Sequence, residues 1–279
     1  MSDYYKKYLK YKYKYKILQL GGYNFETLYK DLMNFCINYN KSRYLINEIF
    51  DEKIILHIKG GASIKYYMNK KNIDSTNITS DIDILILSDN NDIDKENTVS
   101  ELYNELSENF KQYNWNYKIF NGLYNICIDN YCIFDITFIN TLENTEDSMF
   151  LYAVKSLGYN NIHEYADYIL SLSQENLEKV TFTSLKFEYY STTKGIINQI
   201  EYLNSIDEWK NNLEQFKLKL KLNYYRLTST DRSFVEDRIK VLTWQTSNEY
   251  INILKNKLNR YIIKHKIIID LLLPDNLHQ

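Results

Sequence analysis

Hydrophobic residues recur at two different spacings along the chain, and the change between them divides it into two parts. Apolar residues three or four positions apart from Phe25 to Tyr39 predict a helix, and a second helical stretch follows over 42–50. Short apolar runs then alternate with helical patterns up to about Asn140, after which only helical spacing continues. We therefore expect an α+β protein in which a mixed-sheet lobe precedes an all-helical lobe.

The first lobe is expected to contain five strands and the helices that connect them. Continuous or alternating apolar runs predict the strands, and spacing of three or four predicts the helices. Asp129 and Asn130 give a two-residue hairpin signal between the last two strands. The expected strands are 53–58, 82–87, 115–120, 124–128 and 131–138, and the expected helices after the first two strands are 62–70 and 95–113.

The composition is that of a soluble globular protein. The 279 residues suffice for two lobes, and 44% hydrophobic with 25% charged residues exclude a disordered chain. A net charge of −2 excludes a protein that is basic throughout, so any site for a polyanion must be local. Because neither a signal peptide nor an apolar run of about 18 residues occurs, we expect an intracellular, soluble protein without membrane contact.

Basic residues gather in a leader over 1–22. Six lysines are interleaved with tyrosines there, and a Gly-Gly pair closes the segment. Two interpretations stay open: a solvated helix or tail, or an accessory contact to nucleic acid through lysine charge and tyrosine stacking. The expected division of the chain is this leader, the α/β lobe over 23–145 and the helical lobe over 146–279.

The three cysteines are Cys36, Cys127 and Cys132. Their number is odd, and no two of them form a C-x-x-C pair. This usage predicts a reducing compartment, with neither a zinc site nor a disulfide framework.

Three aspartates interrupt or precede apolar strands. Asp81 and Asp83 stand two positions apart at the start of "DIDILIL", so they project to one side of the strand, and Asp135 lies within "YCIFDITF". Carboxylates at the edge of an apolar sheet are costly unless a cation neutralises them. Since hard oxygen ligands suit Mg²⁺, these aspartates are candidates for a magnesium site.

A Gly-Gly pair supplies a second candidate element. Gly60 and Gly61 end the strand "IILHI" and precede a helix, so their backbone N–H groups are able to approach phosphate oxygens closely. Ser63 adds a hydroxyl to the same turn. We expect this turn to bind the phosphates of a nucleotide.

These motifs, in the order strand, Gly-Gly, helix, D-x-D strand and later strand aspartate, resemble the polymerase-β-like nucleotidyltransferase superfamily. Within it, "HIKGGASIKYYM" followed by "SDIDILIL" looks most like the catalytic subunit of the poly(A) polymerases of large, mimivirus-like DNA viruses. The A/T-rich codon usage that 28 tyrosines and a single proline suggest fits that origin. The resemblance covers about residues 50–140.

The resemblance implies a catalytic domain over 23–145 whose Asp81, Asp83 and Asp135 bind Mg²⁺ or Mn²⁺. By a two-metal mechanism it would transfer a nucleoside monophosphate, AMP from ATP, to the 3′ hydroxyl of RNA, in the host cytoplasm or the virion. Alternatives stay open: another acceptor such as a protein, a nucleotide or tRNA, or a non-catalytic binding or assembly subunit. The resemblance also leaves open whether the chain acts as a homodimer or with a partner subunit.

Lys194 and His57 carry two further polar groups that such a site could use. Lys194, in "LKFEYYSTTKGI", is a candidate phosphate ligand because this superfamily draws such groups from a helix facing the metals. A solvated helix lysine is the competing interpretation. His57, within an apolar strand, is interpreted as a satisfied core histidine rather than as a catalytic base.

Overall fold

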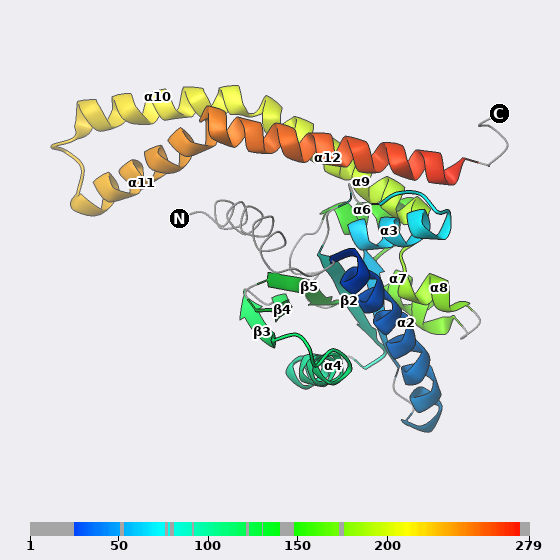
Figure 1. Cartoon of the computed structure of the whole chain (residues 1–279). Coiled ribbons are helices and arrows are strands. Elements are labelled where there is room, and N and C mark those ends of the chain that lie inside the picture. The colour runs from blue at the N-terminus through cyan, green and yellow to red at the C-terminus, as the bar shows by residue number, and fades with distance from the viewer. Residues whose placement is uncertain are drawn as a thin grey trace. The chain divides into compact units, whose positions relative to one another are not determined.

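The computed structural model describes residues 25–50, 53–75, 78, 81–90, 92–120, 123–129, 131–139, 148–172 and 176–273 (Figure 1). The basic leader expected over 1–22 lies outside this part of the chain. The chain consists of two compact units, Met1–Glu188 and Tyr189–Gln279. The expected boundary between a catalytic domain and a helical domain at 145/146 does not coincide with this division and stays a prediction.

The first described element is one long helix, α2, over Phe25–Phe50. The sequence suggested two helical stretches here, and that detail was wrong because nothing interrupts the helix. The segment contains neither glycine nor proline. Ser42, at the expected junction, donates from Oγ to the carbonyl of Tyr39 at 2.9 Å, a contact that a helical serine makes without breaking the helix.

A mixed five-stranded sheet follows, in the order β1-β2-β5-β4-β3. β2 pairs with β5 in parallel, and the other neighbours are antiparallel. The expectation of an α+β fold with a mixed sheet is confirmed. The strands are β1 Ile54–Lys59, β2 Ile82–Ser88, β3 Trp115–Phe120, β4 Leu123–Ile128 and β5 Tyr131–Phe138.

One face of this sheet forms the main core. Leu56, Ile84, Ile126 and Ile136 project into it and pack with apolar residues of α2 and of α4, which spans Lys95–Asn109. The strand β2 is buried along nearly its whole length, which explains why its residues are apolar on both faces of the sheet. α3, over Gly61–Lys70, connects β1 to β2 and contributes Ala62 to the same cluster.

Among the described residues, the other helices that precede α9 are short. They are α6 Ser148–Ser156, α7 Ile162–Ser171 and α8 Leu177–Thr181. After α8 the chain extends and pairs with the end of β1, where Phe182 bridges to Ile58 and the N–H of Thr183 donates to the Ile58 carbonyl at 2.9 Å. This pairing brings a segment distant in sequence beside the Gly-Gly turn.

Every regular element described after β5 is a helix. The second unit contains most of α9, Leu185–Asn204, followed by α10 Ile206–Asn223, α11 Ser229–Gln245 and α12 Asn248–Leu272. The apolar stretch over 233–273 is divided into α11 and α12 because Ser247 caps the second helix, accepting a hydrogen bond from Tyr250 N–H at 3.2 Å.

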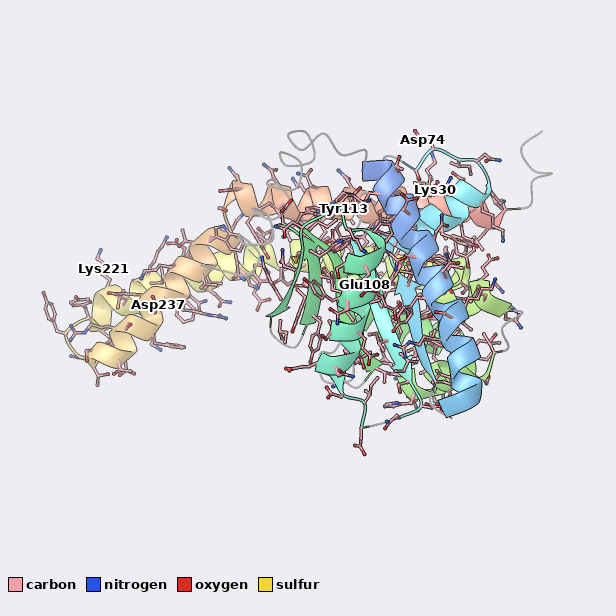
Figure 2. The ribbon with its side chains drawn as sticks, turned by 60° about the horizontal axis from the view of Figure 1, so that its bottom comes forward. Lys30, Asp74, Glu108, Tyr113, Lys221 and Asp237 are labelled. Carbon is pink, nitrogen blue, oxygen red and sulfur yellow. A yellow bond between two sulfur atoms is a disulfide. The ribbon has the colours of Figure 1, made fainter. Side chains whose placement is uncertain are left out.

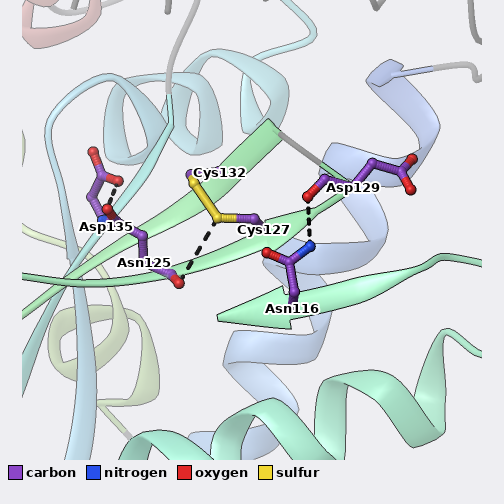
Figure 3. Close-up of a disulfide and its surroundings, with 6 residues drawn as sticks. All are labelled: Asn116, Asn125, Cys127, Asp129, Cys132 and Asp135. Atoms are coloured by element: carbon purple, nitrogen blue, oxygen red, sulfur yellow. Dashed lines mark hydrogen bonds between the residues drawn. A yellow bond between two sulfur atoms is a disulfide. The ribbon is translucent and has the colours of Figure 1, made fainter. Parts of the chain in front are cut away.

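The structure corrects the expectation for the cysteines. Cys127 of β4 and Cys132 of β5 are joined by a disulfide across the hairpin, while Cys36 is free and buried (Figure 3). An odd cysteine count does not reveal this pair, because it is the hairpin that places Cys127 and Cys132 opposite each other in the strand register. None of the described helices has the length and apolar character needed to cross a membrane.

Candidate functional site

A row of polar residues crosses the sheet from edge to edge. Lys59 of β1 lies opposite Asp83 of β2, Asp83 opposite Asp135 of β5, Asp135 opposite Asn125 of β4, and Asn125 opposite Lys118 of β3. Residues directly opposite on neighbouring strands project to the same face of a sheet. The row therefore places two aspartates at its centre, on the face opposite the main core.

The two central aspartates come from adjacent parallel strands in exact register with each other. Strands in a sheet lie about 4.8 Å apart, so the two side chains start from neighbouring positions on one face. Both are half-buried, and the residues on either side of them along each strand, such as Ile84 and Ile136, are buried. Asp81 precedes β2 and is 9% exposed. The register thus places Asp83 and Asp135 side by side, and the expectation that Asp81 completes a metal-binding triad with them stays a prediction.

Asn125 holds one of the two carboxylates. Its Nδ2 donates to Asp135 Oδ1 at 2.8 Å, as Figure 3 shows. A charge-assisted hydrogen bond of this kind fixes a carboxylate more firmly than a neutral one. Sequence reasoning did not select Asn125, because its proximity to Asp135 depends on the β4–β5 register rather than on spacing along one strand.

The Gly-Gly turn lies directly beside the D-x-D motif. Gly60 has φ +74° and ψ −144°, a conformation that is essentially restricted to glycine. A Cβ on this residue would lie 2.8 Å from Asp83 Oδ2. Glycine is therefore required here for two reasons, the backbone conformation and the approach of the Asp83 carboxylate.

A buried glutamate that sequence reasoning missed fixes this turn. Glu188, at the start of α9 and 2% exposed, accepts the Gly60 N–H at Oε1 over 2.8 Å and the Thr183 hydroxyl at the same oxygen. The Gly60 N–H is thus already engaged, which leaves Gly61 and the first turn of α3 as the candidates for phosphate contact. The available signal was an acidic residue among the apolar and aromatic residues of "LKFEYY".

Ser63 has a structural contact in this arrangement. It is fully buried, and its hydroxyl donates to the backbone carbonyl of Thr183 at 2.8 Å. This bond joins α3 to the extended segment that pairs with β1. Its expected role in phosphate binding stays a prediction, and in the structure the hydroxyl faces protein backbone.

His57 is confirmed as a satisfied core histidine. Its Nδ1 lies 2.8 Å from the Val180 carbonyl, and its Nε2 lies 2.9 Å from the Tyr165 hydroxyl. A carbonyl only accepts, so Nδ1 carries the proton and Nε2 accepts from Tyr165. Complete burial lowers the pKa of His57 to about 4, which keeps the ring neutral.

Lys194 belongs to α9 in the second unit, beyond the division at Glu188, and is half-buried. Its expected contact with phosphate stays a prediction. Lys59, which the sequence argument did not single out, instead lies in the aspartate row, and its Nζ is 5.7 Å from the centre of the Phe150 ring.

Within the described residues, no group of three or more His, Cys, Asp or Glu side chains is arranged to hold a metal ion. The donor set at Asp83 and Asp135 nevertheless fits a divalent cation in chemical type, since two carboxylates start from adjacent strands and hard oxygen ligands suit Mg²⁺. Comparison of the chain with protein-family models, curated proteins and solved structures finds no match.

Proposed function

We propose that this protein is a divalent-metal-dependent nucleotidyltransferase that transfers AMP from ATP to the 3′ hydroxyl of RNA. The observation that carries the proposal is the register pairing of Asp83 with Asp135, beside a turn in which Gly60 approaches the Asp83 carboxylate. A glycine turn at the end of β1, a D-x-D motif at the start of β2 and an aspartate of β5 thus lie on neighbouring strands of the sheet. Their convergence supports the resemblance on which the assignment is based.

Each residue has a proposed part in the transfer. Asp83 and Asp135, with Asp81 at the start of β2, would hold Mg²⁺ or Mn²⁺. Gly61 and the first turn of α3 would bind the triphosphate through backbone N–H groups. When bound, the metal ions would activate the acceptor hydroxyl and stabilise the pyrophosphate that leaves.

The reaction forms one bond and breaks another. The 3′ oxygen of the acceptor bonds to the α-phosphorus of ATP, and the bond from that phosphorus to the bridging oxygen breaks. Pyrophosphate leaves, and the proton of the acceptor hydroxyl passes to water. Glu188 has no proposed chemical step, because its Oε1 accepts from the Gly60 N–H and from the Thr183 hydroxyl and so holds the turn.

The test is a transfer assay with α-labelled ATP, Mg²⁺ and separate acceptors: an RNA with a free 3′ hydroxyl, the same RNA with a blocked 3′ end, a free nucleotide, tRNA and a protein. Label in the RNA with the free end, and none with the blocked end, supports the proposal. Label in another acceptor would keep the chemistry and change the substrate. Absence of label in every acceptor would favour a binding or assembly subunit.

The supporting variant is Asp83→Asn, with Asp92→Asn as its control. Asp92 is an exposed aspartate outside the row, so its loss should leave transfer unchanged. Asp83→Asn retains the shape of the side chain and removes the charge that a metal requires, so it should abolish label transfer. Equal transfer by both variants would contradict the assignment of Asp83.

A further inference from the structure

A cavity in the second unit is distinct from the aspartate row. It has a volume of about 380 Å³ and is lined by residues from the end of α9, from α10 and from α11. Lys221 and Asp237 mark the α10–α11 hairpin in Figure 2. The volume lies within the range of about 300–1,000 Å³ that small-molecule sites occupy.

Aromatic rings form the apolar part of the wall. Trp209 and Phe216 are seven residues apart on α10, so they lie on the same face of that helix, and Tyr202 projects from α9. The rings of Tyr202 and Trp209 meet edge to face with centroids 4.8 Å apart. Trp209 also packs on the small core around Ile206, which fixes its position.

The polar part of the wall is not used by the protein itself. Arg238, Glu208, Asn212 and Gln245 line the cavity, and no hydrogen bond or ion pair links their side chains to another described residue. Arg238 and Glu208 are exposed, while the two amides are half-buried. A guanidinium group, a carboxylate and two side-chain amides are therefore available to a ligand.

We propose that this cavity binds one unpaired purine nucleotide of a single-stranded RNA, an inference that rests on the proposed function for the biological origin of the RNA. Aromatic rings stack on bases, and the side-chain amides of Asn212 and Gln245 match the paired donor and acceptor of an adenine edge. The Arg238 guanidinium matches a phosphate, and the Glu208 carboxylate matches the hydroxyls of ribose. The cavity binds one nucleotide of the acceptor RNA, whereas the aspartate row acts at the 3′ end of that RNA.

The experiment measures the affinity of a fluorescent oligoadenylate for the full chain by anisotropy, in a salt series without divalent metal. Trp209→Leu should weaken binding by about tenfold, because stacking contributes about 1–3 kcal/mol for each base. Arg238→Gln should weaken binding and lower the log-log salt slope by about 0.7, the share of one phosphate contact on a single strand. Asn212→Ala should weaken binding of oligoadenylate more than that of oligouridylate.

Two control variants come from the same hairpin. Tyr225→Leu removes an aromatic residue that is 93% exposed, and Arg226→Gln removes an exposed cation, both outside the cavity. Both should bind the oligonucleotide as the unaltered chain does. If Trp209→Leu fails to fold, the exposed Arg238→Gln variant decides the result.

Wild-type affinity and slope in the cavity variants would overturn the inference, and so would an equal loss in the controls, which would indicate a diffuse basic surface. An occupant from a partner protein would likewise leave oligonucleotide affinity unchanged in every variant. Asp83→Asn separates this inference from the proposed function, since it should bind oligoadenylate normally while failing to transfer AMP. If the unaltered chain transfers AMP but the cavity variants bind oligoadenylate normally, the cavity inference is rejected and the proposed function is retained.

Discussion

Acid should destabilise this protein through one buried histidine. His57 is completely buried, its Nδ1–H is donated to the Val180 carbonyl and its Nε2 accepts from Tyr165. Protonation of Nε2 would place a charge in the core and force the Tyr165 hydroxyl to change from donor to acceptor. Burial accordingly lowers the pKa of His57 from the ordinary 6.5 to about 4.

The sign and size of the effect follow from this difference. Between pH 6.5 and 4 the unfolded chain binds a proton at His57 that the folded chain does not, so stability falls as the pH falls through this window. The contribution is fully present above pH 6.5. Because one unit of pKa corresponds to about 1.4 kcal/mol, complete loss amounts to roughly 3 kcal/mol of unfolding free energy.

The assay is urea unfolding followed by circular dichroism at several pH values across the window. His57→Asn keeps an amide donor near the Val180 carbonyl but has no group that titrates there, so its stability should change much less with pH than that of the unaltered chain. The control His163→Gln replaces a half-buried histidine of α7 and should keep the original pH dependence. Parallel pH profiles for His57→Asn and the unaltered chain would refute this reasoning.

Further substitutions test three separate parts of the structure. Gly60→Ala should lower the unfolding free energy by about 1–3 kcal/mol and should also reduce transfer, because the added Cβ meets the Asp83 carboxylate. Gly158→Ala is its control: Gly158 has φ +99° and no atom lies within 4 Å of the added Cβ, so this variant should lose stability alone. Thermal unfolding and transfer assays distinguish the two variants. Asn125→Leu should lower kcat about tenfold with little change in KM, because it removes the hydrogen bond that orients Asp135. A tenfold rise in KM with unchanged kcat would argue against a positioning role for Asn125. Cys127→Ser, or reduction by dithiothreitol, should lower the unfolding free energy by about 2 kcal/mol, and unchanged urea midpoints with and without reductant would contradict the pairing.

Strand positions were predictable because their residues alternate or remain apolar over a defined length. The expected strands 115–120 and 131–138 match β3 and β5 to the residue. Asp83 and Asp135 could be selected from the sequence because each is a charge in an otherwise apolar strand, which is costly without a function. Helix ends were harder to predict, as α2 and the α11–α12 break show, because a single serine either continues or caps a helix depending on its local hydrogen bond.

The remaining site residues depend on strand order and on long-range pairing. Lys59 and Asn125 enter the row only because β1 and β4 flank the two central strands, an order that local spacing does not encode. Glu188 reaches Gly60 across 128 positions of sequence through the segment that pairs with β1. The disulfide likewise depends on the hairpin register at Cys127 and Cys132.

The central claim is that Asp83 and Asp135 together bind the metal that enables nucleotidyl transfer. The most direct measurement is the initial rate of AMP incorporation into RNA over a Mg²⁺ series for the unaltered chain, Asp83→Asn, Asp135→Asn and the control Asp92→Asn, each checked for folding by circular dichroism. We predict Mg²⁺-dependent incorporation by the unaltered chain and the control, and none by either row variant at any Mg²⁺ concentration. Unaltered incorporation by a folded Asp83→Asn or Asp135→Asn protein would contradict the claim.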